Sequence, residues 1–132
     1  DTTFDFRERK KIRRDILKNN RQLKLGNGYD HCWVLNDYNK KLRKISEVYS
    51  NQTRIKMEVF TDLPGLQLYS GNFLDGSLNS KKGKKYINRS GLCLETQAFP
   101  NSPNNESFPT TILEPGEKFY SQTSFKFSTV EK

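Results

Sequence analysis

The sequence contains little histidine and little cysteine, with one histidine and two cysteines in 132 residues. A single histidine, His31, cannot build a multi-histidine metal site within this chain. Cys32 and Cys93 are far apart and show no zinc-type spacing, so they predict neither a metal site nor a disulfide framework. We expect both cysteines to be reduced and packed as small hydrophobic residues.

Standard catalytic and nucleotide-binding motifs are also missing. The sequence has no P-loop, no Gly-x-Gly-x-x-Gly and no Gly-x-Ser-x-Gly segment. A Ser-His-Asp triad could use only His31, and no serine is predicted to lie beside it. The common nucleotide-dependent and serine-hydrolase classes are therefore not indicated.

Long hydrophobic runs are absent as well. No stretch approaches the roughly 20 apolar residues that a membrane-spanning helix needs, and no secretory hydrophobic region is present. We therefore expect no membrane partner and a cytoplasmic location. The chain begins at Asp1 without Met, so an earlier segment or signal could precede it. Secretion stays open as an alternative because three Asn-x-Ser/Thr sequons occur, at Asn51, Asn88 and Asn105.

The positive charge is confined to the first part of the chain. The net charge is +8, with 15 basic and 7 acidic residues in positions 1–56 and 8 of each in positions 57–132. Residues 7–24 are predicted to form a short amphipathic helix or a charged surface crossover. The favoured interpretation is that their charged side chains simply face solvent. Contact with nucleic acid or anionic lipid is the alternative, but no aromatic residues interleave with these charges. We expect no nucleic-acid partner.

Aromatic residues and β-type patterns are abundant. Nine Phe, six Tyr and one Trp favour a packed core in a chain that is only 33% hydrophobic. Short segments bounded by Pro and Gly turns predict an all-β antiparallel sandwich, as one domain over residues 1–132 with no second domain. The predicted strands are Cys32–Leu35, Ile45–Tyr49, Ile55–Thr61, Leu66–Tyr69, Leu92–Leu94 and Tyr120–Val130.

Three clusters place polar side chains where a strand meets a turn: residues 28–31, 63–73 and 91–100. Their candidate residues are Asp30, Gln67, Asn72 and Glu95. Glu95 follows an apolar strand and precedes a proline-rich loop, so we expect partial burial, which would make it a better base near neutral pH. From the residues alone, a glutamate that pairs with a lysine or caps loop amides is the more common case.

The three clusters together resemble the aldose 1-epimerase (galactose mutarotase) family. The phrase PGLQLYSGNFLDG is similar to the family segment P-G-x-Q-x-Y-T/S-G-N-F-L-x-G, and GYDHCWVL to G-[YF]-D-H-x-[FW]-x-L. The stretch from GLCLETQAFP to SFKFS resembles the closing segment that contains C-L-E-T-Q. The resemblance runs from about Thr3 to the C-terminus and keeps the family order.

The resemblance implies a galactose mutarotase-like β-supersandwich and the interconversion of the α and β anomers of a free aldohexose such as galactose or glucose, without a cofactor. Such ring opening needs a base at the C1 hydroxyl and an acid at the ring oxygen. Glu95 matches the catalytic base, and Asp30 and Gln67 match substrate-binding residues. His31 accompanies Asp30 in a supporting role, and Asn72 is expected to stabilise a turn.

The length departs from the family, whose members span twice this length or more. We expect this chain to be the C-terminal part of an epimerase domain, hence an incomplete sandwich. The acid histidine belongs to an upstream segment of the family that has no counterpart here. The missing N-terminal half, or a second copy of the chain, is then an expected partner. The alternative is a carbohydrate-binding module without catalysis, with Trp33 or Phe99 stacked on a sugar.

Overall fold

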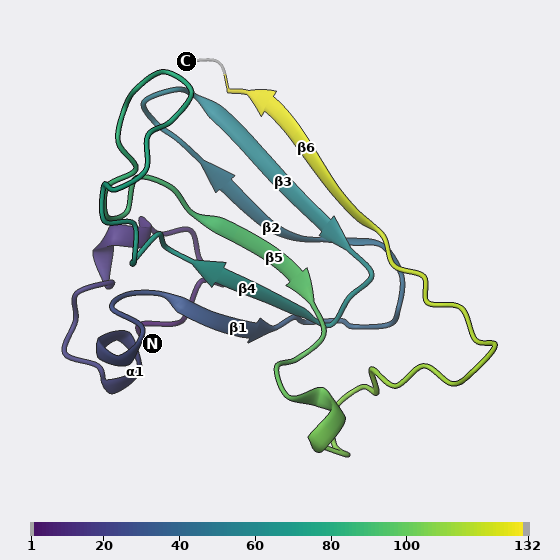
Figure 1. Ribbon diagram of the computed structural model, residues 1–132. Helices are drawn as coiled ribbons and strands as arrows, with labels where there is room; N and C mark the ends of the chain where they lie inside the picture. Colours follow the sequence, from purple (N-terminus) through teal and green to yellow (C-terminus); the bar gives the residue numbers. More distant parts are fainter. Residues whose placement is uncertain (1, 131–132) are drawn as a thin grey trace. The chain divides into compact units, whose positions relative to one another are not determined.

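The computed structural model describes residues 2–130, which form two antiparallel β-sheets with little helix (Figure 1). The predicted all-β class is confirmed. The ends of the predicted domain, residues 1, 131 and 132, lie outside the described residues. The strands are β1 (Asp30–Val34), β2 (Arg43–Tyr49), β3 (Ile55–Thr61), β4 (Gly65–Tyr69), β5 (Cys93–Gln97) and β6 (Thr123–Thr129). The helical segments are η1 (Ile12–Arg14), α1 (Arg21–Leu25) and η2 (Ser102–Asn104).

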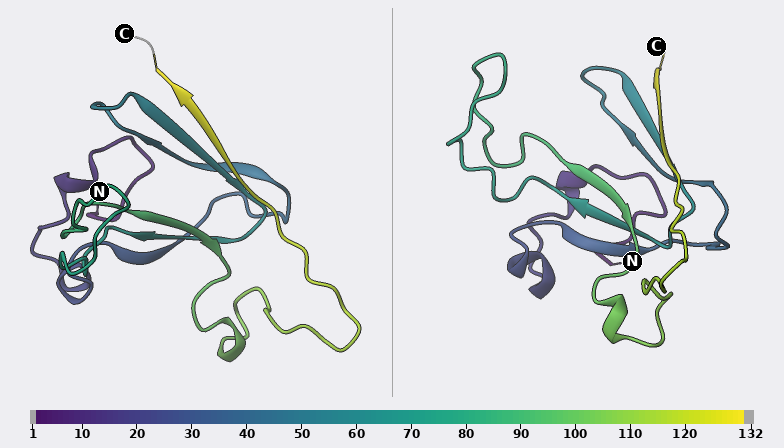
Figure 2. Two further views of the ribbon diagram at one scale, coloured as in Figure 1. Left: turned by 45° about the horizontal axis from the view of Figure 1, so that its top comes forward. Right: turned by 45° about the vertical axis from the view of Figure 1, so that its right-hand side comes forward.

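Each sheet has three strands, in the orders β1-β4-β5 and β2-β3-β6. The arrows of β1, β4 and β5 alternate in direction in Figure 1, and the pairs β2–β3 and β3–β6 are antiparallel. A long irregular segment connects β5 to β6, interrupted by η2, and is visible in both views of Figure 2. The strand β6 therefore pairs with β3 across a large separation in sequence.

The contacts divide the chain into two compact units. Unit 1 comprises the residues up to His31 together with Gln67–Glu95, and unit 2 comprises Cys32–Leu66 together with the residues from Thr96 onward. The three candidate residues Asp30, Gln67 and Glu95 all belong to unit 1. The structure of unit 1 is therefore what matters for the site.

Tyr29 is the centre of the core of unit 1. Its side chain is 0% exposed, and the rings of Phe4 and Phe6 meet it edge-on at centroid distances of 5.9 and 5.2 Å. Its hydroxyl donates a hydrogen bond to the Thr3 carbonyl at 2.8 Å. Burial, followed by the charge of Asp15, raises the pKa of Tyr29 to about 12. The aromatic contacts thus fasten the first residues of the chain to the start of β1.

The basic segment 7–24 is more structured than a solvated face. It holds the short turn η1 and the one-turn helix α1 rather than one amphipathic helix, so the crossover interpretation is the better one. Ile16 is buried, but Leu17 is 79% exposed. The side chains of Lys10 and Asp15 form an ion pair of 2.9 Å at 7% and 5% exposure. A charged segment can therefore be fastened to the core through paired charges.

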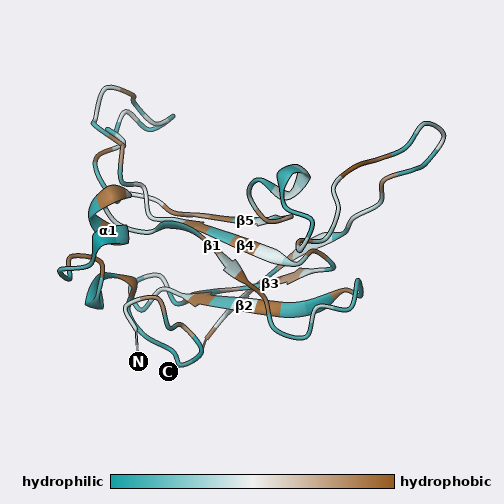
Figure 3. Cartoon of the chain, turned by 90° about the horizontal axis from the view of Figure 1, so that it is seen from below, coloured by the Kyte–Doolittle hydropathy of each residue, from teal (hydrophilic) through white to brown (hydrophobic). Residues whose placement is uncertain are grey.

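Unit 2 contains the sheet β2-β3-β6, whose two faces differ in polarity. Val59 and Thr61 of β3 are 0% exposed, and the register places Val59 opposite Phe125. On the other face Lys44 forms ion pairs with Glu47 and Glu58. Hydrophobic and hydrophilic bands follow one another along β2 in Figure 3. The apolar residues Ile45 and Val48 of β2 are three positions apart, and the register with β3 shifts between Lys44 and Ser46.

The segment that enters β4 is held by an arginine of unit 2. The Arg43 Nη1 donates to the carbonyls of Thr61 and Leu63 at 3.1 and 3.3 Å, and its Nε donates to the Asn36 carbonyl. Gly65 follows, and a Cβ added there would lie 2.9 Å from Cys32 Sγ. Only glycine fits this close approach at the start of β4. Within residues 2–130, no helix has both the length and the hydrophobicity to span a bilayer.

Candidate functional site

The site is built on Asp30 and Gln67, which come from different sequence clusters. Asp30 begins β1 and Gln67 is the middle residue of β4. The Gln67 Nε2 donates a hydrogen bond to Asp30 Oδ1 at 2.8 Å. The fold therefore brings together two of the residues that the sequence singled out, 37 positions apart.

The alternation of β4 explains why Gln67 faces this site. Leu66 and Leu68 are buried, whereas Gln67 and Tyr69 between and after them are half-buried. Successive side chains of a strand point to opposite faces, so the leucines pack inward and Gln67 and Tyr69 share the other face. The Gln67 Oε1 atom is enclosed and has no hydrogen-bond partner.

Glu95 lies in the middle of β5, and its side chain is exposed. The expectation of partial burial is wrong, because β5 is the outer strand of its sheet and, within residues 2–130, has β4 as its only neighbouring strand. The Gln97 side chain bonds the Cys32 thiol, and Cys32 in turn lies against Gly65. Gln97, Cys32 and Gly65 therefore lie on one face of the sheet. Along its own strand, Glu95 is two positions from Gln97, Asp30 is two from Cys32, and Gln67 is two from Gly65. Because side chains two positions apart point to the same side, Glu95, Asp30 and Gln67 share that face.

His31 supports the backbone of Asp30 rather than facing the same side. Its Nδ1 accepts a hydrogen bond from the Asp30 N–H at 3.0 Å, and its ring meets Phe4 edge-on at a centroid distance of 4.8 Å. Burial lowers the pKa of His31 more than the nearby Asp30 charge and a hydrogen bond to the Gln22 backbone raise it. The His31 Nδ1 is engaged by the backbone of Asp30.

Asn72 is buried and joins the turn before β1 to the turn after β4. Its Nδ2 donates to the carbonyls of Gly26 and Tyr29 at 2.7 and 2.8 Å, and its Oδ1 accepts from Ser70 Oγ at 2.6 Å. Gly28, with a φ of +133°, lies so close to Asn72 Oδ1 that no side chain could replace its hydrogen. Asn72 thus fixes the backbone that leads into Asp30 and is itself far from solvent.

Ser70 is a residue of this network that the sequence did not single out. Its Oγ accepts a hydrogen bond from the Tyr29 N–H at 3.0 Å while it is bonded to Asn72. A serine beside a glycine in a turn has no distinctive sequence signal. Its hydrogen bond to the Tyr29 backbone can be recognised only from the fold, which brings Tyr29 and Ser70 together although they are 41 positions apart.

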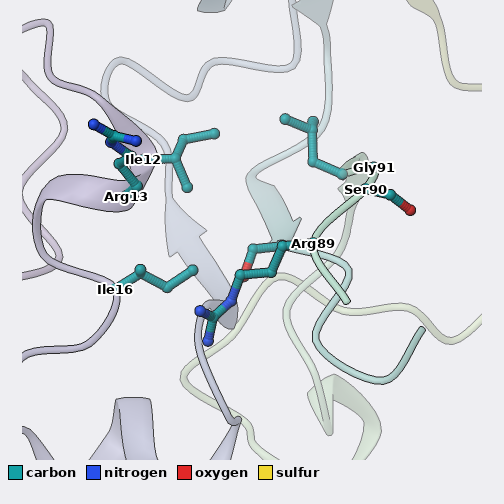
Figure 4. A pocket seen from close by; sticks show the side chains of 8 residues that line it. Ile12, Arg13, Ile16, Arg89, Ser90 and Gly91 are labelled. Atoms are coloured by element: carbon teal, nitrogen blue, oxygen red, sulfur yellow. The ribbon is translucent and has the colours of Figure 1, made fainter. Parts of the chain in front are cut away.

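One pocket of about 360 Å³ lies elsewhere in unit 1. Ile12 and Ile16 extend toward the segment of Arg89, Ser90 and Gly91 in Figure 4. None of Asp30, Gln67 or Glu95 lines it. Over the part of the chain that the structure describes, no group of three or more His, Cys, Asp or Glu side chains could hold a metal ion.

By strand alternation, the exposed Glu95 carboxylate lies on the face that carries the hydrogen-bonded Asp30–Gln67 pair. Glu95 exposes its carboxyl group to solvent, and Asp30 and Gln67 present an oxygen-rich pair that can bond hydroxyl groups. His31 accepts a hydrogen bond from the Asp30 N–H, and Asn72 fixes the backbone as far as Tyr29, one residue before Asp30. Such a face suits a small polyhydroxylated molecule better than an apolar ligand.

Comparison with known proteins agrees with this chemistry. A family model described as aldose 1-epimerase matches residues 1–126. The chain is 44% identical over 102 residues to galactose mutarotase from Bos taurus, covering 77% of this chain and 30% of that protein. It is 37% identical over 128 residues to aldose 1-epimerase from Escherichia coli, covering 96% of this chain and 36% of that protein.

A solved structure extends the comparison to the fold. The chain superimposes on an aldose epimerase homologue from C. elegans with a TM-score of 0.77 and 25% identity, over 99% of this chain and 38% of that one. The chain thus spans about a third of the length of the relatives it matches.

Proposed function

Since the chain belongs to the aldose 1-epimerase family, we propose that it supplies the base and the sugar-binding groups for anomer interconversion of a free aldohexose such as galactose or glucose. Glu95 is the base that takes the proton of the C1 hydroxyl. Asp30 accepts a hydrogen bond from a sugar hydroxyl, and Gln67 lines the same site.

The hydrogen bond between Gln67 Nε2 and Asp30 Oδ1 carries this proposal. It joins two of the segments that resemble the family, and both residues belong to the compact unit that holds Glu95. A carboxylate fixed by an amide keeps one oxygen for a ligand hydroxyl, since an ionised carboxyl group can accept several bonds. The relatives named galactose mutarotase support the choice of hexose.

Catalysis needs a second proton-transfer group on the opposite side of the sugar. His31 is the one histidine of the chain, and it fills this role poorly because its Nδ1 is engaged by the Asp30 backbone N–H. We therefore assign the acid to a group outside these 132 residues. The chain alone binds the sugar but does not accelerate the exchange of its anomers above the rate in buffer.

Galactose titration tests the sugar-binding part of this proposal. Calorimetry or amide-proton NMR on the wild-type chain detects saturable galactose binding, and Asp30→Asn weakens it about tenfold, because a charged acceptor contributes more than a neutral one. Asp37→Asn, which changes an exposed aspartate of unit 2, is the matched control and leaves the affinity unchanged. Absence of any binding by the wild type contradicts the proposal.

A carbohydrate-binding module without catalysis is the second candidate. The single, engaged histidine favours it for the isolated chain. Of the two aromatic residues considered for sugar stacking, Phe99 already packs edge-on against Phe108 at a centroid distance of 5.1 Å. The two candidates differ in the expected effect of Glu95→Gln on the rate of anomer exchange, measured once an acid group is supplied. The epimerase proposal predicts that Glu95→Gln lowers this rate, and the binding-module proposal predicts no change.

A further inference from the structure

Tyr69 and Phe73 form an aromatic pair on the turn that follows β4. Their rings are nearly parallel, with an interplanar angle of 15° and a centroid distance of 6.4 Å. The Phe73 N–H donates a hydrogen bond to the Tyr69 hydroxyl at 3.0 Å. Despite this fixed geometry, the Phe73 side chain is 64% exposed.

A buried network holds the turn between the two rings in place. Ser70 and Asn72 point into unit 1 and bond to each other, whereas Tyr69 and Phe73 point outward. Gly71 has a φ of +67°, and a Cβ there would lie 2.5 Å from the Gly91 carbonyl oxygen. The chain therefore reverses tightly at this position and returns Phe73 to Tyr69.

Tyr69, the strand residue of the pair, lies on the face of β4 that carries Gln67. Tyr69 and Gln67 are two positions apart, and residues i and i+2 of a strand are roughly 7 Å apart on one face. That spacing is comparable to the width of a hexose ring. The network that fixes the pair also bonds the Tyr29 carbonyl, one residue before Asp30.

We propose that the Tyr69–Phe73 pair is a stacking platform for the apolar C–H face of the hexose and that it favours galactose over glucose. This inference rests on the proposed function. The axial 4-hydroxyl of galactose leaves the hydrogens of C3, C4 and C5 together on one face, and the positive edge of C–H groups is attracted to the face of an aromatic ring. Glucose, with an equatorial 4-hydroxyl, lacks this continuous patch.

A rigid pair serves such a ligand better than a single mobile ring. The hydrogen bond holds the Tyr69 hydroxyl against the Phe73 backbone, and the stacking restricts the Phe73 ring before any sugar binds, so little conformational entropy is lost on binding. Solitary exposed hydrophobic residues are common on protein surfaces, but they are not usually fixed in this way. Phe73 therefore contributes chiefly to affinity and to sugar preference.

Galactose and glucose titrations of substituted chains test the inference. Phe73→Ala lowers the galactose affinity about three- to tenfold and reduces the preference over glucose, whereas Phe73→Tyr keeps both. Phe119→Ala is the matched control, because Phe119 is also a strongly exposed phenylalanine but belongs to unit 2. Saturation-transfer NMR on the wild type gives its strongest signals at the galactose protons H3, H4 and H5.

The outcomes separate this inference from the proposed function. If the wild type binds galactose and Asp30→Asn weakens it while Phe73→Ala binds equally well, the sugar site stands and the stacking platform is wrong. Strongest saturation transfer at H1 and H2 also contradicts the platform. If the wild type binds neither sugar, both the proposed function and the platform fail. The amide spectrum of Phe73→Ala confirms that the variant is folded.

Discussion

At the residue scale, Asn72 is the side chain on which the geometry of the site depends most. It satisfies the carbonyls of Gly26 and Tyr29 and the Ser70 hydroxyl in the interior. Asn72→Ala removes the donor to the Gly26 carbonyl, whereas the Tyr29 carbonyl keeps the Ser70 N–H as its partner, so we expect a loss of about 1–3 kcal/mol in the free energy of unfolding. Urea denaturation measures this loss.

Asn104 offers a matched control for that change. It is an exposed asparagine whose Nδ2 bonds the Asn101 side chain at the surface. Asn104→Ala should alter the free energy of unfolding by about 0.5 kcal/mol or less. Equal losses of unfolding free energy in Asn72→Ala and Asn104→Ala would show that the buried hydrogen bonds of Asn72 do not stabilise the fold more than a surface hydrogen bond does.

Asp15 makes stability depend on acidic pH. Hydrogen-bonded ion pairs with Lys18 and then Lys10 lower its pKa to about 2, from an ordinary value of 3.8. A carboxyl group whose folded pKa is lowered stabilises the protein above its unfolded pKa and loses that contribution as the pH falls through the folded value. The contribution of Asp15 is therefore complete above about pH 4 and disappears toward pH 2.

Urea denaturation at pH 5, 4, 3 and 2 tests this pH dependence. The difference in unfolding free energy between the wild type and Asp15→Asn should be largest at pH 5 and shrink steadily toward pH 2. Asp5 also has a lowered pKa, caused by Arg7, and its contribution cancels because both proteins carry it. A difference that is constant over this range would contradict the assignment.

Some residues of the site can be predicted from sequence and others cannot. The clusters containing Asp30, Gln67 and Asn72 are recognisable in the sequence, and the structure joins the first two directly. The exposure of Glu95 was not predictable, since it depends on β5 being an outer strand of its sheet. The buried pair of Lys10 and Asp15 resembles any exposed charged segment until the fold is known.

At the element scale, strands with alternating polarity were predicted best. Ile55–Thr61 is predicted and observed with the same bounds, because its apolar residues recur at every second position. The strand expected at Leu92–Leu94 instead extends over Cys93–Gln97, where polar side chains conceal the strand pattern. The segment 7–24 keeps helical spacing of apolar residues but forms only η1 and α1.

The central strand β3 should determine the stability of unit 2. Val59 is fully buried, so Val59→Ala is expected to cost about 2 kcal/mol of unfolding free energy through lost burial and the cavity it leaves. Val34→Ala is the control, because Val34 ends β1 and is 73% exposed. Its effect should stay within about 0.5 kcal/mol by thermal or urea unfolding. A similar loss of unfolding free energy in Val59→Ala and Val34→Ala would contradict the assignment of Val59 to the core of unit 2.

At the scale of the whole molecule, the chain is short beside its relatives and its charge is unevenly distributed. The chain spans about a third of the relatives it matches, while the +8 charge is concentrated in residues 1–56. Part of that charge is used internally, since Lys10 and Lys18 pair with Asp15. The neutral remainder contains Gln67 and Glu95. The charge excess therefore carries little information about the ligand.

The central claim is that these 132 residues hold the sugar-binding groups and the base, but only one of the two proton-transfer groups. The most direct test is the polarimetric rate of galactose anomer interconversion at a sugar concentration that saturates the chain. We predict that the wild-type chain and Glu95→Gln both show the rate of buffer alone. Rapid interconversion by the wild type that disappears in Glu95→Gln would contradict the claim, because the chain would then contain its own acid.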